Sequence, residues 1–314
     1  MWDIQAYEES LRALAWPELT AWEGWMHYAL AGGGKRLRPW LAWEAYAFYA
    51  QDKASWPHAL PVLQAIELLH TFTLVHDDVM DKSALRRGRP TVYRQTDENT
   101  AILIGDALLI AVYQQLAAVP APHNARLIQL LSQAALRVCH GQLLDLALAA
   151  KPTAEVSLDD YLRMITEKTG ALIGASLEMG AALADVPPPE LAALRAAGEA
   201  IGRFFQLQDD YLDAFGQETG KVPGGDIAEG KKTFLWLWAW QEAAPTEKRL
   251  LDDPNTPPEQ RREVGLHLYM RLGLKSRAEA FLAEAFKELH EKIAAVRMAP
   301  VLKELTEKLL GRQR

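Results

Sequence analysis

The sequence predicts an all-α protein. Apolar residues follow helical spacing along nearly the whole chain of 314 residues, and no segment sustains period-two alternation with β-branched residues. No low-complexity linker interrupts the chain, so we predict a single domain over residues 1–314. Two Asp-Asp-x-x-Asp motifs, each closing an apolar helical run, show where the chemistry of this helical protein is concentrated.

Composition argues against several classes of function. The chain is 49% hydrophobic and 24% charged, as in ordinary globular proteins, and its net charge of −7 argues against general nucleic-acid binding. The single Cys139 cannot form an internal disulfide, which favours a reducing compartment. The acidic N-terminus is unlike a signal peptide, and the longest uncharged run, from Ala107 onward, is broken by glutamines and prolines. We therefore expect a cytoplasmic protein without a membrane span.

The apolar pattern predicts the helices in order. Residues 3–30 read as two helices that are broken near Trp16-Pro17. Further helices are expected over 39–51, over 57–81, through Leu116 after a start or interruption at Gly105-Asp106, and over 124–150, 158–184, 190–215 and 234–314, the last with a proline-rich break at 254–258.

The first acidic motif, Asp77-Asp78-x-x-Asp81, ends an apolar run that begins near Ala59. At 3.6 residues per turn, Asp77 and Asp81 differ by about 40° around the helix axis, and Asp78 lies about 100° away. The C-terminal end of a helix disfavours anions, so these carboxylates need a cationic partner, and divalent ions are the obvious candidates. His70 lies two turns earlier, within about 20° of Asp77, which favours a ligand contact over a core role.

The second acidic motif, Asp209-Asp210-x-x-Asp213, repeats this spacing 132 residues later (209 minus 77). That separation is too large for neighbouring helical turns, but the two motifs can face each other across a bundle. The chain contains two Asp-Asp pairs that lack the third Asp. Asp159-Asp160 is interpreted as first-turn charge behind an N-cap, and Asp252-Asp253 as a loop.

Two basic clusters accompany the first motif. The loop Gly32-Gly-Gly-Lys-Arg-Leu-Arg-Pro39 brings three cations together behind three glycines, which suits a phosphate, although a solvated basic turn is an equal alternative. The segment Lys82–Thr91 adds Arg86 and Arg87 a few residues beyond Asp81. Arginines placed so close to metal-binding carboxylates suggest a shared anionic ligand.

Polar residues also gather around the second motif. Lys168-Thr169-Gly170 lies in an apolar helical run, where both side chains need partners if they are buried. Gln206 lies about 60° from Asp209 on a helix. A glycine-rich loop beyond Asp213 carries Lys221 and Lys231. Because two basic clusters and a lysine loop exceed what one phosphate group needs, we infer two diphosphate sites, one metal-bound and one held mainly by Lys and Arg.

From about Gly32 to Thr233 the chain resembles the trans-isoprenyl diphosphate synthases of the polyprenyl synthetase family. It carries the family's motifs in order: Gly32–Pro39, the first acidic motif with Arg86-Arg87-Gly88, Gly105-Asp106, Gly141-Gln142 with Asp145, Lys168-Thr169, and the second acidic motif with Lys221 and Lys231. The resemblance implies one antiparallel helical bundle around a deep central cavity, and a homodimer. It also implies condensation of isopentenyl diphosphate with dimethylallyl, geranyl or farnesyl diphosphate.

The resemblance assigns roles to individual residues. Three Mg²⁺ ions would be bound by Asp77, Asp78, Asp81, Asp209, Asp210 and Asp213, and would hold the allylic diphosphate together with Arg86, Lys168, Lys221 and Lys231. Isopentenyl diphosphate would be bound by Gly34, Lys35, Arg38, His70 and Arg87, and Thr169 and Gln206 would stabilise the developing carbocation.

Product length depends on Phe72 and Thr73. The resemblance makes Phe72, five residues before Asp77, the floor of the product cavity, whereas an ideal helix turns Phe72 about 140° from Asp77 and leaves Thr73 nearer the cavity. We expect products of C15 to C20, with C20 slightly favoured because Thr73 is not aromatic. Replacing Phe72 by Ala is expected to lengthen the product.

Three other functions share some of these features. Class I terpene cyclases and head-to-head condensing enzymes also use acidic motifs, but they do not need the Gly34–Arg38 loop with His70. A non-catalytic regulatory subunit of a heteromeric synthase would be expected to lose metal ligands, and this chain retains both sets.

Overall fold

The computed structural model describes residues 2–216 and 223–311, with the side chains of residues 308–311 excepted. The chain forms two compact units. The first comprises Met1–Ala135 and Leu172–Arg195, and the second Leu136–Ala171 and Ala196–Arg314. The prediction of a single domain over residues 1–314 stays a prediction.

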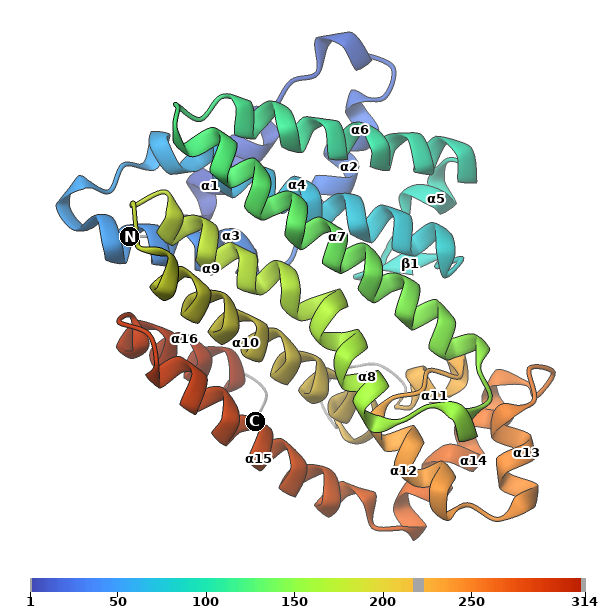
Figure 1. Ribbon diagram of the computed structural model, residues 1–314. Coiled ribbons are helices and arrows are strands. Elements are labelled where there is room, and N and C mark those ends of the chain that lie inside the picture. The colour runs from blue at the N-terminus through green and yellow to red at the C-terminus, as the bar shows by residue number, and fades with distance from the viewer. Residues whose placement is uncertain (1, 217–222, 312–314) are drawn as a thin grey trace. The chain divides into compact units, whose positions relative to one another are not determined.

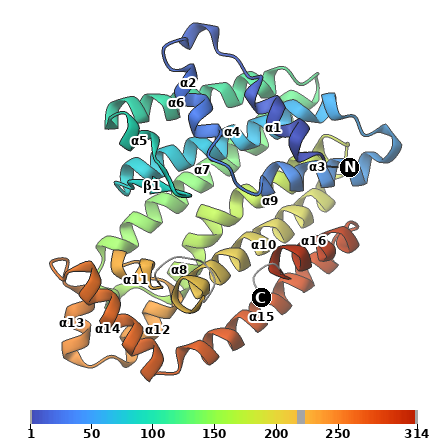
Figure 2. The same ribbon diagram turned by 180° about the vertical axis from the view of Figure 1, so that it is seen from behind.

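The first unit is built around one long central helix. That helix, α4, is buried over most of its length because apolar residues occupy every face of its middle turns, and it packs against α3 and α6 (Figures 1 and 2). The elements of this unit are α1 (Ile4–Arg12), α2 (Glu23–Leu30), α3 (Leu37–Ala50), α4 (Trp56–Met80), β1 (Leu85–Arg86), β2 (Arg89–Pro90), α5 (Val92–Gln95) and α6 (Glu98–Ala117).

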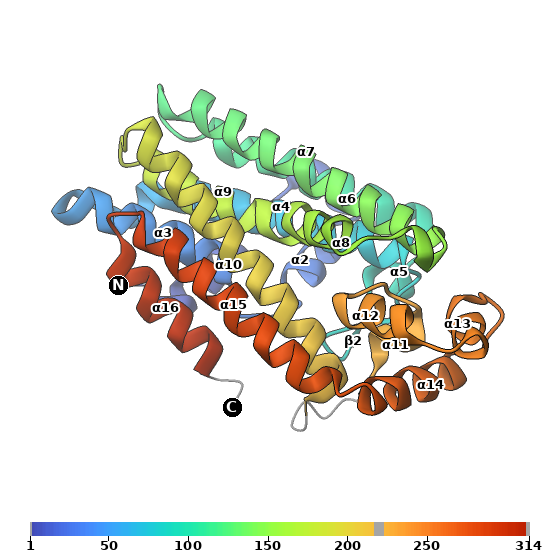
Figure 3. The ribbon, with the colours of Figure 1, turned by 60° about the horizontal axis from the view of Figure 1, so that its bottom comes forward.

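The second unit has an aromatic core. Phe234, Trp236 and Trp238 of α12 are buried, and Phe281 of α15 stacks against the first and third of them. Figure 3 shows α11 to α14 gathered in one group. The helices of this unit are α8 (Leu158–Ile165), α11 (Gly225–Glu229), α12 (Phe234–Glu242), α13 (Pro245–Asp252), α14 (Pro258–Arg271), α15 (Leu274–Ala294) and α16 (Ala299–Gly311).

Three helices contain a boundary between the units. These are α7 (His123–Ala150), α9 (Ala171–Ala182) and α10 (Pro188–Phe215). A π-helical turn, Thr166–Gly170, joins α8 to α9. Short 3₁₀ turns lie at Pro17–Leu19, Gln51–Lys53 and Thr153–Glu155.

The all-α prediction is confirmed: in the described residues the hairpin of β1 and β2 is the only sheet. The predicted helical ends at both acidic motifs are also confirmed, since α4 ends at Met80 and α10 at Phe215. Two predictions of where helices start or break are wrong. The helix expected over 158–184 is interrupted by the π turn, and the helix expected to start or break at Gly105 begins at Glu98 and runs through it.

Two described helices, α4 and α6, are long and apolar enough to cross a membrane by length and composition alone. The apolar window of α4 is 67% buried within the structure, as in the core helix of a globular fold, whereas that of α6 is 39% buried. The open face of α6 carries Ile102, Leu103, Ile110 and Tyr113.

Candidate active site

The first acidic motif carries its own counter-ion. Asp78 is only 4% exposed and accepts a hydrogen bond from Arg86 Nε at 2.9 Å, while Arg86 Nη2 donates to Asp77 Oδ2 at 3.2 Å. Asp81 is the C-cap of α4 and donates its N–H to the Asp77 carbonyl at 2.8 Å. Burial raises the pKa of Asp78 to about 6, against the opposing charge of Arg86. The motif is thus a partly buried carboxylate cluster that favours added positive charge.

A tight hairpin separates two neighbouring arginines. The turn between β1 and β2 places Arg87 at φ 52° and Gly88 at φ 75°, the left-handed pair typical of a two-residue hairpin. Arg86 therefore contacts the carboxylates, whereas Arg87 Nη1 donates to the Gly33 carbonyl. Gly34 has φ 125°, and a Cβ there would lie 2.6 Å from Arg87 Nη1, so this position requires glycine.

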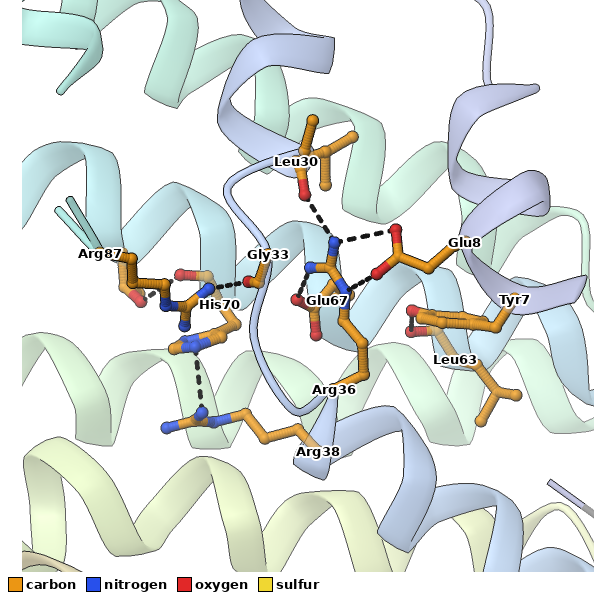
Figure 4. Close-up of polar contacts among 12 residues, drawn as sticks. Tyr7, Glu8, Leu30, Gly33, Arg36, Arg38, Leu63, Glu67, His70 and Arg87 are labelled. Atoms are coloured by element: carbon orange, nitrogen blue, oxygen red, sulfur yellow. Dashed lines mark hydrogen bonds and ion pairs between the residues drawn. The ribbon is translucent and has the colours of Figure 1, made fainter. Parts of the chain in front are cut away.

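Arg38, His70 and Arg87 form one polar cluster, as the sequence predicts (Figure 4). Arg38 Nη1 donates to His70 Nε2 at 3.0 Å. A guanidinium only donates, so His70 accepts at this nitrogen and its ring is neutral. Burial, reinforced by the charges of Arg38 and Arg87, lowers the pKa of His70 well below its usual value. Burial also lowers the pKa of Arg38 to about 10, while Lys35 on the same loop is exposed.

Phe72 and Thr73 lie on different sides of α4. The Phe72 ring stacks edge-on against His76 at 4.7 Å between centroids, and His76 Nε2 lies 3.0 Å from the Ile102 carbonyl of α6. A Cβ at Gly105 would lie 2.2 Å from His76 Nε2, which explains the glycine of the Gly105-Asp106 motif. Thr73 donates its hydroxyl to the His70 carbonyl at 2.8 Å. Phe72 is therefore backed by α6 through His76.

In the second unit, the π turn presents Lys168 and Thr169 to polar partners. Lys168 Nζ donates to Asp145 Oδ2 at 2.6 Å, and Thr169 Oγ1 donates to Gln206 Oε1 at 3.2 Å. A Cβ at Gly141 would lie 2.2 Å from the Lys168 backbone nitrogen, so α7 approaches the turn closely only because it has glycine there. The predicted residues Lys168, Thr169 and Gln206 thus lie together.

The second acidic motif is tied into the same group. Asp210 is 5% exposed and accepts from Tyr161 Oη at 2.6 Å and from Gln206 Nε2 at 2.8 Å. Burial raises its pKa to about 7, with Asp226 and Asp209 adding to the shift. Asp213 accepts the N–H of Asp226 at 3.0 Å, and burial raises its pKa to about 6.

The lysine loop is anchored beside this group. Lys231 Nζ lies 3.2 Å from Asp226 Oδ1 and 2.8 Å from Glu229 Oε2, whereas Lys221 lies outside the described residues. A cavity of about 180 Å³ is lined by the predicted Lys168, Thr169, Gln206, Asp209, Asp210 and Lys231, together with Asp145, Tyr161, Asp226 and other residues of this unit. In the second unit, therefore, the predicted residues that the structure describes, apart from Asp213, share one cavity.

The carboxylates suit a hard divalent cation by their chemistry. Within residues 2–216 and 223–311, no group of three or more His, Cys, Asp or Glu side chains is arranged to hold a metal ion. The raised pKa values of Asp78, Asp210 and Asp213 mark clusters in which each additional negative charge is unfavourable. Oxygen ligands in such clusters are those that Mg²⁺ prefers. The role of these residues as ligands stays a prediction.

Sequence reasoning assigned no role to several residues of the site. Arg36 is buried in ion pairs with Glu8 and Glu67, so it is not open to a phosphate. The interpretation of the three loop cations as a phosphate site is therefore wrong for Arg36. Asp145, Tyr161 and Asp226 complete the second cluster. Glu67 is a single charged residue inside an apolar helical run. The sequence therefore indicates that Glu67 needs a partner, because a buried charge is unfavourable without one.

Comparison with known proteins decides the family. A model of polyprenyl synthetases matches residues 20–267. The chain belongs to the polyprenyl synthetase family. It is 37% identical over 252 residues to a short chain isoprenyl diphosphate synthase of Methanocaldococcus jannaschii, covering 79% of this chain and 75% of the relative. A geranylgeranyl diphosphate synthase of Mycobacterium tuberculosis is 39% identical over 234 residues, covering 74% and 65% respectively.

A solved structure supports the same assignment. The crystal structure of a geranylgeranyl pyrophosphate synthase matches with a TM-score of 0.90 and 32% identity, over 100% of both chains. The predictions of family, of all-α fold and of a prenyltransferase enzyme are therefore confirmed. As a polyprenyl synthetase, the protein makes trans-prenyl diphosphates of short-chain type.

Proposed function

We propose that this polyprenyl synthetase condenses isopentenyl diphosphate head to tail (1′-4) with an allylic diphosphate, dimethylallyl, geranyl or farnesyl. The products are all-trans prenyl diphosphates of C15 to C20, with C20 slightly favoured, plus diphosphate. The observation that carries this proposal is the pair of unlike anion sites along α4. Arg86 accompanies the carboxylates of Asp77 and Asp78, while Arg38, His70 and Arg87 form a cluster two turns away. Two such sites suit two diphosphates, one that leaves during the reaction and one that stays intact.

The cluster of Arg38, His70 and Arg87 would bind the diphosphate that stays intact. Guanidinium groups donate in a fixed fork that fits phosphate oxygens. Neutral His70 accepts from Arg38, which orients that guanidinium without adding a competing negative charge. Lys35, exposed on the same loop with Gly34, would add a further cation for isopentenyl diphosphate.

The leaving diphosphate would be bound at the acidic motifs. Up to three Mg²⁺ ions, held by Asp77, Asp78, Asp81, Asp209, Asp210 and Asp213, would supply Lewis-acid neutralisation of its charge. Arg86, Lys168, Lys221 and Lys231 would add positive charge to it. As the allylic C–O bond breaks, negative charge grows on this group, so these cations stabilise the transition state more than the ground state.

The π turn would stabilise the allylic cation. Asp210 accepts from the amide nitrogen of Gln206, which directs Gln206 Oε1 toward the Thr169 hydroxyl. The Thr169 hydroxyl proton is thereby used in the hydrogen bond to Gln206, so the lone pairs of the hydroxyl oxygen would face the cation. The double bond of isopentenyl diphosphate then attacks the cation, the new C–C bond forms, and the proton lost passes to an oxygen of the departing diphosphate.

Product length would be limited at Phe72. Its ring is backed by His76, which lies against the Ile102 carbonyl and Gly105 of α6, so the side chain is fixed on one side. Replacing Phe72 by Ala is expected to lengthen the product by about one isoprene unit, because such a unit spans roughly one helical turn. Chromatography of the dephosphorylated products checks this, and an unchanged length rejects the floor.

A second copy of the chain would cover the open face of α6. Ile102, Leu103, Ile110 and Tyr113 form an apolar surface on this helix, and burial of such a surface between two copies gives a homodimer. Sedimentation of the purified chain tests this. Replacing Ile110, which is 61% exposed, by Asp should give monomers.

One assay separates the proposed reaction from its alternatives. The purified protein with Mg²⁺ and radiolabelled isopentenyl diphosphate is offered each allylic primer, and labelled C15 to C20 products are expected. A cyclised hydrocarbon from the allylic diphosphate alone would identify a cyclase, and complete inactivity would indicate a regulatory subunit. Asp77→Asn should abolish turnover, whereas Asp159→Asn, at an exposed position in the first turn of α8, should leave it unchanged.

A further inference from the structure

Arg36 is a buried cation in the middle of the glycine-rich loop. Its guanidinium donates from Nε to Glu8 Oε1 at 2.7 Å, from Nη2 to Glu8 Oε2 at 3.2 Å and to the Leu30 carbonyl at 2.7 Å, and from Nη1 to Glu67. The residue is 5% exposed. One side chain thus joins α1, the end of α2, the start of α3 and the middle of α4 (Figure 4).

Two parallel contacts connect the loop to α4. Arg36 bonds to Glu67, and two residues later Arg38 bonds to His70, which lies one helical turn beyond Glu67. Because both contacts join the same short segment to α4, a displacement of Arg36 also displaces the Arg38 guanidinium. The backbone of Arg36 adopts φ 45° and ψ 40°, a left-handed conformation that is unfavourable for a residue with a Cβ. The ion pairs offset that cost.

Glu67 also balances charge in this cluster. Burial lowers the pKa values of Arg38 and Arg87, and the Glu67 carboxylate opposes the shift in both. Replacing this carboxylate with a neutral group would leave three arginines close together with less compensation. Glu67 therefore favours the charged state of the cluster before any diphosphate arrives.

We propose that Arg36, held by Glu8 and Glu67, is the positioning residue of the isopentenyl-diphosphate site and does not itself contact that substrate. The ion pairs fix the loop of residues 31–38 so that Arg38 reaches the diphosphate beside His70 and Arg87. This inference rests on the proposed function, because it assigns a support to one of the two proposed diphosphate sites.

The test uses the full chain and three variants. Arg36→Lys keeps the charge but cannot donate to Glu8, Glu67 and Leu30 in the same geometry. Glu8→Gln weakens the network from its more exposed side and is the milder change, should Arg36→Lys fail to fold. Arg195→Lys is the control, since Arg195 of α10 pairs with the buried Glu178 of α9 in the same unit.

Calorimetry without magnesium measures the Kd for isopentenyl diphosphate, and turnover with magnesium gives the KM for each substrate. We expect Arg36→Lys to raise the isopentenyl-diphosphate Kd and KM about tenfold and Glu8→Gln about threefold, because misplaced charges lose affinity steeply. The KM for the allylic substrate should stay within about twofold, a split that a merely structural role would not produce. Arg195→Lys should change neither KM.

Three outcomes overturn the inference. These are an unchanged isopentenyl-diphosphate Kd in Arg36→Lys and Glu8→Gln, an equal rise of both KM values, or an equal effect of Arg195→Lys. If the wild-type chain turns over both substrates and the variants bind isopentenyl diphosphate with unchanged Kd, only this inference is rejected. A wild-type chain that neither binds nor consumes isopentenyl diphosphate rejects the proposed function as well.

Discussion

Each unit contains an arginine that bridges two glutamates beside predicted site residues. In the first unit Arg36 pairs with Glu8 and Glu67, and its side chain is 3% exposed. In the second, Arg137 of α7 donates to both oxygens of Glu167 at 3.1 Å and to Glu199, and its side chain is 32% exposed. Both networks pair one arginine with two glutamates, but the exposed fraction of the arginine side chain differs about tenfold between them.

The difference in burial determines what each network contributes. Removing one partner from a buried ion pair strands a charge that water cannot reach, whereas a pair near the surface is screened and hydrated. The supported segments differ as well. Arg36 fixes an irregular loop that has few hydrogen bonds of its own, while Arg137 braces the π turn, which glycines already place closely against α7 and α10. A Cβ at Gly170 would lie 3.0 Å from the Glu199 carbonyl.

The largest effect is expected from Arg36→Met. It leaves Glu8 and the buried Glu67 without their counter-ion, so the free energy of unfolding should fall by about 3–5 kcal/mol. Urea titration of the whole chain measures this. The double variant Arg36→Met with Glu67→Met removes both buried charges and should recover part of the loss. No recovery would contradict the assignment of the loss to a stranded carboxylate.

The next effect tests the glycine contact of the second unit. In Gly141→Ala the new Cβ would lie 2.2 Å from the Lys168 nitrogen and 2.5 Å from its Cα, so the π turn must move. Because misplacement of reacting groups by about 1 Å costs roughly a hundredfold, kcat should fall by about that factor. Gly24→Ala in α2, where a Cβ meets nothing within 4 Å, is the control. Near-normal kcat in Gly141→Ala would show that the turn does not need its observed position.

The sequence predicts the parts of the site that periodicity controls. The local pattern predicts the helix ends at the two acidic motifs, where α4 ends at Met80 and α10 at Phe215. It also predicts the shared face of His70 and Asp77 and the basic loop. The sequence does not distinguish Arg36 from Arg38, because the partners of Arg36 lie 28 residues before it and 31 after it. Nor does it predict the π turn, since residues 158–184 have a continuous helical pattern and the interruption depends on tertiary contacts with Gly141, Arg137 and Glu199.

A third prediction concerns pH. Burial raises the pKa of Asp210 to about 7, above the usual value of 3.8, so the folded chain keeps a proton that the unfolded chain releases. Stability from this group is therefore full at low pH and is lost as pH rises through 7. Without magnesium, the free energy of unfolding should fall by about 1 kcal/mol between pH 6 and 7 because of Asp210. Asp210→Asn should remove this fall.

Asp160→Asn provides the contrast for this pH profile. Hydrogen bonds from Ser157 lower the pKa of Asp160, so its stabilisation is present near neutral pH and is lost only as pH falls toward acid. Between pH 6 and 7 its variant should parallel the wild type. Asp78 and Asp213, whose pKa values burial raises to about 6, and His70, whose pKa burial lowers, also contribute to the wild-type profile. The difference between wild type and Asp210→Asn therefore measures Asp210, and the same change in both over this interval would contradict the prediction.

The smallest effect is expected from Arg137→Met, which tests the partly exposed network against the buried network of Arg36. Water reaches a third of the Arg137 side chain and about a fifth of each glutamate, so the free energy of unfolding should fall by no more than about 1 kcal/mol. High salt should reduce the difference between variant and wild type, because screening weakens a pair that solvent already reaches. The loss in Arg36→Met should persist in the same salt. If the two variants instead lose equal stability with equal salt dependence, burial does not distinguish the networks, and the glycine contacts contribute less to the π turn than its arginine does.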